Sequence, residues 1–145
     1  MSVIYVLNGP NLNLLGAREP EVYGTFTLSE LGVSLQAWAK AKNQKIKVLQ
    51  TNSEDELIGW IHAAIEEKSA VVINPAAFTH YSYALRDACA ALTGSGLSLV
   101  EVHITNPHTR EAFRHNSVIS GVATGVIAGF GVDSYLLALE QLTRR

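Results

Sequence analysis

The sequence predicts an α/β fold, a doubly wound five-stranded parallel sheet with helices on both faces. Two observations lead to this prediction. Five short apolar segments of strand length alternate with longer segments whose apolar residues recur at helical spacing. The strand segments are also apolar along most of their length, which is typical of parallel strands that are covered on both faces.

The strand segments can be placed in order along the chain. The first is an apolar run of the length of a buried strand. The second contains Lys47 and directly follows Lys45, so it is expected nearer an edge of the sheet. The third is fully apolar. The expected strands are residues 3–7, 46–49, 70–73, 97–102 and, within an apolar region, 122–127.

Helices are expected between and after these strands. Thr27 and Glu30 have the spacing of a capping box at a helix start, and Ser53 and Glu56 repeat it. Further helices are expected over residues 81–92, 109–114 and 134–143. Right-handed crossovers then give a flavodoxin-like sheet of order 2-1-3-4-5. No repeat or linker interrupts the pattern, so residues 1–145 are expected to form one domain.

Composition limits the class of protein. Of the 145 residues, 48% are hydrophobic and 17% are charged, with a net charge of −2. This balance gives no electrostatic footprint for nucleic acid or acidic membranes, and no apolar run is long enough for a membrane span. Cys89 is the single cysteine, which excludes an intrachain disulfide and a cysteine metal cluster. Met1 is followed directly by a strand, so a cytoplasmic protein is expected.

The segment over residues 8–24 is a long connection after the first strand. Most connections in compact domains have about 4–6 residues, and much longer ones are usually lids, binding loops or disordered. Disorder fits poorly because several leucines here need burial, and the glycines and prolines are typical of a shaped loop. Asn11, Arg18 and Tyr23 lie in this segment. A site loop is therefore predicted, with no helix before about Thr27.

The strand ends indicate where a ligand binds. In open parallel sheets, ligands bind beyond the carboxyl ends of the strands, where the strand order reverses. Three segments lie there: residues 8–24, 74–80 and 103–114. They carry amides, imidazoles, guanidiniums and few carboxylates, which suits a small anionic ligand with several hydroxyl groups. Arg110 and Arg114 are four residues apart and are expected on one face of a helix.

Other chemistries find less support. The histidines lie on separate segments without a spaced set of carboxylates, so a metal site is weakly supported. No Gly-Lys-Ser/Thr sequence follows the first strand, which excludes a Walker-type phosphate loop. The lysines lie in the second strand or the helices around it, which argues against a lysine Schiff base at the strand ends.

Tyr23 and His103 are the candidates for proton transfer. A phenol serves as a base only if nearby cations stabilise the phenolate, and Arg18 and Arg110 could supply them. His103 ends a strand in which Glu101 shares its face, because side chains alternate with a period of two. An imidazole that a carboxylate holds in one orientation is well suited to act as a general acid.

With these residues assembled, the chain resembles the type II 3-dehydroquinate dehydratases. The matching motifs extend over essentially the full length of the chain. A set of this many matches in the same order is highly specific for the family. The matching segments are residues 7–16 (LNGPNLNLLG), 18–24 (REPEVYG), 74–80 (NPAAFTH), 101–106 (EVHITN), 110–114 (REAFR) and 125–131, with Tyr135. The family has the flavodoxin-like fold, in agreement with the pattern of the chain.

The resemblance implies dehydration of 3-dehydroquinate to 3-dehydroshikimate, an anti elimination through an enolate. It implies that Tyr23 is the base and that Arg18 and Arg110 favour its ionised form. Asn11 would hold a water that stabilises the enolate oxygen. His103 would donate a proton to the departing hydroxyl group.

The resemblance also implies supporting and binding roles. Glu101 would orient the general acid. The carboxylate and hydroxyl groups of the substrate would be bound by Asn74, His80, Arg114 and the backbone amides of Ile104 and Thr105. In the family an aspartate from a neighbouring subunit reaches the site, and Asp87 matches it. The usual assembly is a dodecamer built of trimers, and no cofactor or metal is implied.

Tyr81 departs from the family pattern, in which a small threonine more often follows the matching histidine. A bulky phenol there would narrow the hydroxyl-binding side or alter subunit contacts. One alternative is therefore a related lyase that acts on another cyclic hydroxy-ketone acid. A second is a non-catalytic flavodoxin-like binding module, which would leave Arg18 and Tyr23 without a purpose. Aromatic biosynthesis and quinate breakdown both use the same chemistry, so either pathway stays open.

Overall fold

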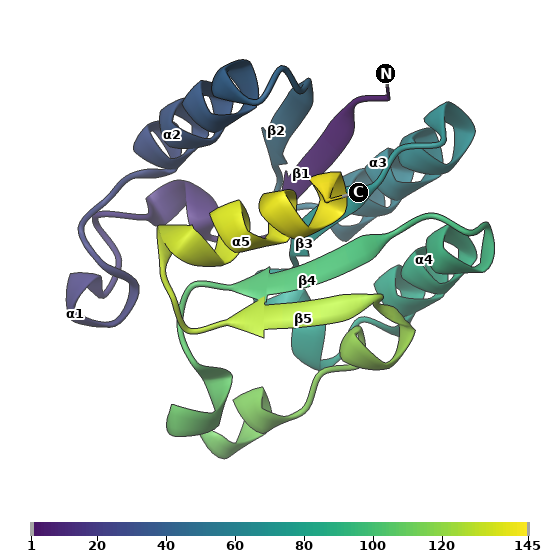
Figure 1. The fold of residues 1–145 in the computed structure, drawn as a ribbon. Coiled ribbons are helices and arrows are strands. Elements are labelled where there is room, and N and C mark those ends of the chain that lie inside the picture. Colours follow the sequence, from purple (N-terminus) through teal and green to yellow (C-terminus); the bar gives the residue numbers. More distant parts are fainter. Residues whose placement is uncertain (1, 145) are drawn as a thin grey trace.

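The computed structural model describes residues 2–144 and has the predicted architecture. All five strands are parallel, and they lie in the order β2-β1-β3-β4-β5 (Figure 1). The strands are β1 (Ile4–Asn8), β2 (Ile46–Gln50), β3 (Val71–Asn74), β4 (Leu99–His103) and β5 (Gly125–Ala128). The second strand lies at an edge of the sheet, as its lysines predicted.

Two pairs of helices cover the faces of the sheet. The four helices are α2 (Leu28–Ala41), α3 (Glu54–Glu67), α4 (Tyr83–Gly94) and α5 (Val132–Thr143). α2 and α5 lie over one face, and α3 and α4 over the other (Figure 1). Because successive side chains of a strand point to opposite faces, Tyr5 and Leu7 of β1 pack in the core under α3 and α4, whereas Ile4 and Val6 pack under α2 and α5. Within residues 2–144, no helix combines the length and the hydropathy that a membrane crossing requires.

Polar caps begin α2 and α3, as the sequence predicted. Thr27 accepts a hydrogen bond from the N–H of Glu30, and the Glu30 carboxylate accepts one from the N–H of Thr27, which completes a capping box. Ser53 accepts a hydrogen bond from the N–H of Glu56. The return bond is not among the contacts of the described residues, so the second predicted capping box is half formed.

Two boundaries on the α4 side of the sheet differ from the prediction. β4 begins at Leu99 because Leu97, although it packs against the core, does not join the parallel ladder. α4 begins at Tyr83 because Ser82 is its N-cap and accepts a hydrogen bond from the N–H of Leu85. The sequence pattern therefore located both elements but placed the start of each two residues too early.

The single helix predicted over residues 109–114 is wrong. The segment forms two 3₁₀ turns, η3 (Pro107–Thr109) and η4 (Ala112–His115). The Asn106 side chain accepts a hydrogen bond from the N–H of His108 and starts the first turn, while Arg110 has extended backbone and ends it.

The connection after β1 also contains two short helical pieces, where none was predicted before about Thr27. They are η1 (Leu12–Leu14) and α1 (Pro20–Tyr23). Leu12 and Leu15 are buried in the core under α2 and α5, so the predicted shaped loop is anchored. Glu19, which precedes α1, has a φ of 40°, a left-handed conformation that a residue with a side chain rarely adopts.

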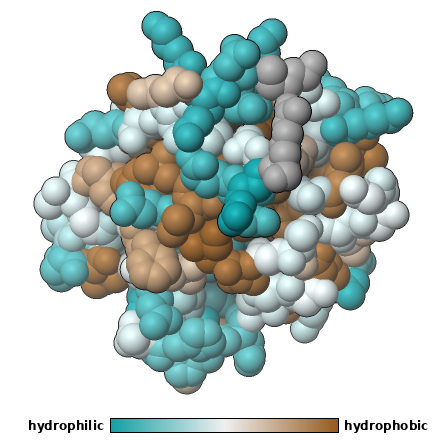
Figure 2. Space-filling view, in the orientation of Figure 1, coloured by the Kyte–Doolittle hydropathy of each residue, from teal (hydrophilic) through white to brown (hydrophobic). Residues whose placement is uncertain are grey.

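One face of the molecule exposes apolar side chains. Figure 2 shows them gathered over β5 and α5. Val126 and Leu137 are each about half exposed there, and the edge strand β5 leaves one side of its backbone unpaired within the sheet. This surface has the character of a contact area.

Candidate active site

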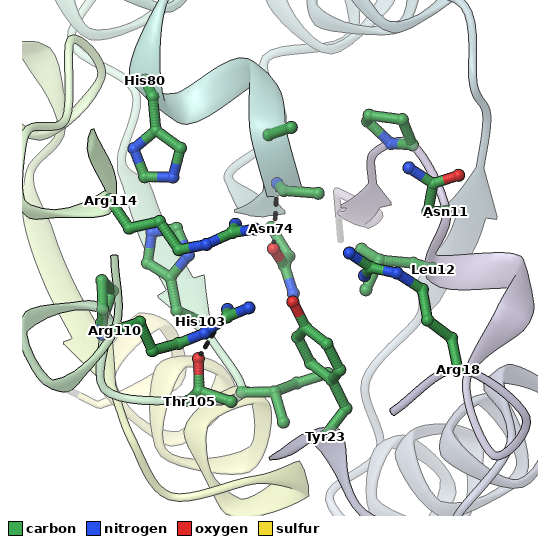
Figure 3. Close-up of a pocket in the computed structure, with 15 residues that line it drawn as sticks. Asn11, Leu12, Arg18, Tyr23, Asn74, His80, His103, Thr105, Arg110 and Arg114 are labelled. Carbon is green, nitrogen blue, oxygen red and sulfur yellow. Dashed lines mark hydrogen bonds between the residues drawn. The ribbon is translucent and has the colours of Figure 1, made fainter. Parts of the chain in front are cut away.

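One pocket lies at the carboxyl ends of β1, β3 and β4 (Figure 3). Ten of the twelve residues singled out from the sequence line it. These are Asn11, Arg18, Tyr23, Asn74, His80, His103, Ile104, Thr105, Arg110 and Arg114. The lining is completed by small or apolar residues that the sequence did not single out, namely Pro10, Leu12, Ala76, Ala77 and Pro107. The predicted location of the site agrees with the pocket, while the chemical role of each residue stays a prediction.

Gly9 allows the ends of β1 and β3 to meet at this pocket. Its N–H donates a hydrogen bond to the Asn74 carbonyl oxygen over 2.8 Å. A Cβ at Gly9 would lie 2.5 Å from the carbonyl oxygen of Pro75, closer than real Cβ contacts allow. A glycine is therefore required for Asn11 and Asn74 to face the same space.

A buried network of two amides and a phenol lies beneath the pocket. The Tyr135 hydroxyl donates to Oδ1 of Asn8 over 2.7 Å and accepts from Nδ2 of Asn74 over 2.9 Å. Oδ1 of Asn74 in turn accepts a hydrogen bond from the N–H of Ala76 over 3.1 Å. Burial raises the pKa of Tyr135, so it stays a neutral phenol that can both donate and accept. These bonds fix the orientation of the Asn74 amide.

Tyr23 lies between two guanidinium groups. The Cζ atoms of Arg18 and Arg110 are 4.9 and 4.8 Å from the centre of its ring, and the phenol points into the pocket (Figure 3). Arg110 also donates to the Thr105 hydroxyl over 3.4 Å, and Arg18 forms an ion pair with Glu19 over 3.6 Å. Two cations therefore flank the aromatic ring of Tyr23.

His103 and Glu101 form the predicted pair. Nε2 of His103 lies 2.5 Å from Oε2 of Glu101, which is 1% exposed behind the imidazole. The hydroxyls of Ser117 and Ser120 donate to the same carboxylate. Burial acts to raise the pKa of Glu101, but the hydrogen bonds from His103 and the two serines outweigh it, so the pKa lies below its ordinary value of 4.5. The imidazole therefore faces an ionised carboxylate.

The pocket is electropositive. Three guanidiniums and two imidazoles line it, and among the residues that the structure describes no aspartate or glutamate does. Within residues 2–144, no three His, Cys, Asp or Glu side chains are placed to hold a metal ion. A lining of this kind suits a small anion.

Arg110 and Arg114 reach the pocket without the shared helix that their spacing predicted. Arg110 follows η3 and Arg114 lies in η4, and the two side chains are 14% and 15% exposed. Nε of Arg114 donates to the Glu111 carboxylate over 3.1 Å. The backbone between η3 and η4 therefore brings Arg110 and Arg114 to the same pocket, as a shared helical face was expected to do.

The space inside the pocket is about 80 Å³. That volume holds roughly two or three waters, whereas sites for organic ligands usually have about 300–1,000 Å³. Arg18 and Tyr23 belong to the connection that covers one side of the pocket (Figure 3). A neighbouring cavity of about 310 Å³ shares His80, His103 and Arg114 with this pocket.

Asp87 and Tyr81 lie outside the pocket of their own chain. The Asp87 side chain is 73% exposed on α4 and pairs with Arg86 over 2.9 Å. Tyr81 is 58% exposed and packs edge-on against Phe78, with ring centres 6.0 Å apart. The expectation that Tyr81 narrows the hydroxyl-binding side is therefore not met within this chain, and a surface role fits its position better.

Two groups of contacts at the site were missed from the sequence. Ser117 and Ser120 bond to Glu101 across the fold, and no spacing along the chain predicts this contact. Tyr135 was noticed only as part of the family resemblance, and its link to Asn8 and Asn74 depends on the docking of α5.

Comparison with known proteins gives a consistent result. A family model described as dehydroquinase class II matches residues 2–143. The chain is 56% identical over 142 residues to a 3-dehydroquinate dehydratase of Salinispora arenicola (strain CNS-205). The aligned residues make up 98% of this chain and 97% of that protein. It is 54% identical over 146 residues to a 3-dehydroquinate dehydratase of Xanthomonas campestris pv. campestris (strain 8004), covering 100% and 97%.

Solved structures agree at the level of the fold. A type II dehydroquinase from Butyrivibrio crossotus DSM 2876 superimposes with a TM-score of 0.95 at 41% identity, over 99% of this chain and 98% of that one. A type II dehydroquinase from Propionibacterium acnes superimposes with a TM-score of 0.93 at 46% identity, over 98% and 96%.

Proposed function

The chain belongs to the class II dehydroquinase family and is a 3-dehydroquinate dehydratase, and we propose that it acts by an anti elimination through an enolate, with Tyr23 as the base and His103 as the general acid. The observation that carries the proposal is the placement of a phenol and an imidazole, each beside charged partners, in one pocket. Tyr23 lies between two cations, and His103 lies against an ionised carboxylate. Such a pair supplies a base and an acid at the same pH.

Tyr23 starts the reaction as a phenolate. Its oxygen takes a proton from the carbon next to the ketone, and the electron pair of that C–H bond moves onto the ketone oxygen to form the enolate. Arg18 and Arg110 stabilise the phenolate, while Asn11 holds a water that donates to the enolate oxygen. The first half of the reaction therefore consumes the phenolate and leaves a neutral phenol.

His103 completes the elimination. The enolate re-forms the ketone, the new double bond forms, and the carbon–oxygen bond of the hydroxyl group breaks. The protonated imidazole gives its proton to the departing oxygen, so that water leaves. Because Nε2 faces Glu101, we assign the donated proton to Nδ1 of His103.

The remaining lining residues orient the substrate. Arg114 and the backbone amides of Ile104 and Thr105 bind the carboxylate and neighbouring hydroxyl groups, together with Asn74 and His80. The fixed orientation of the Asn74 amide supports this role, because a preorganised donor loses little entropy on binding.

We also propose that the enzyme works as a dodecamer built of trimers, in which Asp87 reaches the site of a neighbouring subunit. Its exposure and its distance from its own pocket support this role. Tyr81 and Tyr83 are exposed beside it, and a second apolar surface lies over β5 and α5. Two such surfaces suit an assembly with two kinds of subunit contact.

Turnover of 3-dehydroquinate tests the proposed function directly. The purified protein should produce the ultraviolet absorbance of a conjugated enone from this substrate. Another cyclic hydroxy-ketone acid, offered in parallel, should give no such rise. Binding of 3-dehydroquinate without any absorbance change at high enzyme concentration would favour a binding module and sink the proposal.

A further inference from the structure

Two serines hold the carboxylate of Glu101 in addition to His103. Ser120 donates to Oε1 over 2.7 Å, and Ser117 lies 3.1 and 3.2 Å from Oε1 and Oε2. Both serines belong to the segment before β5, which Ile119 anchors because its side chain is fully buried in the core under α3 and α4. The proposed function does not use these two hydroxyls.

Ser117 can only donate to Glu101. Its oxygen accepts hydrogen bonds from the N–H groups of Ile119 over 3.1 Å and Ser120 over 2.9 Å. A hydroxyl has two acceptor positions and one proton, so both acceptor positions are used and the proton is left for the carboxylate. The backbone therefore fixes the direction of this hydroxyl.

Glu101 in turn is surrounded by donors. Two serine hydroxyls and an imidazole N–H converge on its two oxygens. A protonated carboxyl group would bring a donor of its own into this ring of donors and would leave one of them without an acceptor. This arrangement keeps Glu101 ionised although it is buried.

We propose that Ser117 and Ser120 are positioning residues of the reaction: they hold Glu101 as an oriented carboxylate and thereby hold His103 in the state that donates its proton. The proposal rests on the assignment of His103 as the general acid. Without the serines, burial favours the neutral form of Glu101. The proton shared by the pair then moves from Nε2 of His103 to the carboxyl group. The imidazole that remains is neutral, so its Nδ1–H is a much weaker acid toward the departing hydroxyl.

The test separates the two halves of the reaction. Elimination is followed by enone absorbance, and proton abstraction by the uptake of solvent deuterium into recovered 3-dehydroquinate. Ser120→Ala is the cleaner variant, because among the described contacts the Ser120 hydroxyl bonds to Glu101 alone. We expect elimination to fall roughly tenfold, a part of the contribution of a general acid, while deuterium uptake and KM stay near the wild-type values.

Two further variants make the readout specific. Ser69→Ala is the matched control, because Ser69 is fully buried before β3 and its hydroxyl has no partner within residues 2–144. It should leave the ratio of exchange to elimination unchanged. In a Glu101→Gln background, Ser120→Ala should cause no further loss, because serines that act through Glu101 lose their effect with its charge.

The outcomes distinguish the serine role from the function on which it rests. An equal loss of exchange and elimination in Ser120→Ala, or an additional loss in the Glu101→Gln background, overturns the serine role and leaves the proposed function in place. A wild-type protein that forms no enone, or a His103→Ala variant whose ratio of exchange to elimination does not rise, overturns the proposed function and the serine role with it.

Discussion

At the scale of single residues, the Tyr23 hydroxyl is the atom on which the proposed reaction depends most. Tyr23→Phe keeps the ring between Arg18 and Arg110 but removes the base. We expect kcat to fall by about 10²- to 10⁴-fold, the usual contribution of one acid or base. Binding of the substrate, measured by calorimetry, should change little because the ring and both cations remain. A variant that keeps wild-type turnover would refute the base assignment.

Glu101 makes the stability of the protein depend on pH. Its pKa is below 4.5 in the folded protein, since the bonds from His103 and the serines outweigh burial, and returns to about the ordinary value on unfolding. The unfolded chain therefore binds more protons in this window. The stabilisation is complete above pH 4.5 and is lost as the pH falls through the folded-state pKa.

Urea unfolding at a series of pH values measures this effect. The free energy of unfolding of the wild type should drop below pH 4.5 more steeply than that of Glu101→Gln, which has no proton to take up at this position. Parallel curves for the two proteins would show that another group is responsible.

Residue chemistry could be predicted where a residue type and its spacing carry the signal. Tyr23 with Arg18, and His103 with Glu101, were identified in this way, and the structure places each pair together. Ser117 could not be identified, because a serine has many roles and its direction here is set by two backbone N–H groups that only the folded turn brings near.

At the scale of elements, α5 is joined to β1 and β3 by the Tyr135 hydroxyl. Tyr135→Phe would leave the amides of Asn8 and Asn74 buried without this partner. We expect a loss of about 1–3 kcal/mol in the free energy of unfolding, the cost of an unsatisfied buried polar group. Tyr83→Phe is the control, since Tyr83 is 71% exposed and should change stability by less than about 0.5 kcal/mol. Equal effects in the two variants would contradict the role of the network.

The segment that carries Arg18 and Tyr23 is expected to move. The pocket of about 80 Å³ is small for a ring-sized substrate, and the segment contains the left-handed Glu19, directly after Arg18. In hydrogen exchange, the amides of residues 18–23 should be protected more strongly with bound product than without it. Those of Leu12–Leu14, which Leu12 anchors in the core, should change less. Identical exchange with and without product would argue for a rigid entrance.

The longer helices and the strands were predictable because buried positions recur in the sequence as apolar residues with a regular spacing. Segments that are apolar along most of their length located all five strands, and capping residues located the starts of α2 and α3. The short turns α1, η3 and η4 were not predicted correctly, because they contain one turn each and bury little apolar surface. Their geometry is decided by Pro20, by Asn106 and by tertiary contacts instead.

At the scale of the whole molecule, the role of Asp87 predicts complementation between subunits. Tyr23→Phe and Asp87→Ala should each be nearly inactive as pure oligomers. When the two are dissociated, mixed in equal amounts and reassembled, some sites combine an intact Tyr23 with an intact Asp87 from a neighbour. Random mixing should restore roughly a quarter of the wild-type activity.

Light scattering gives the control for this experiment, because each variant must keep the assembly of the wild type. Each variant put through the same dissociation and reassembly alone should stay inactive. If the mixture also stays inactive although mixed oligomers form, Asp87 does not act across subunits.

The bond between Tyr135 and Asn8 joins residues 127 positions apart in the chain. β1 emerges from the ribosome before α5, so Asn8 has no Tyr135 hydroxyl to bind until α5 has been synthesised. During that interval the amides of Asn8 and Asn74 lack the phenol that orients them, and the floor of the pocket is unfinished. The nascent chain can therefore gather its sheet early, but it gains the geometry to hold a substrate only in the final moments of its synthesis.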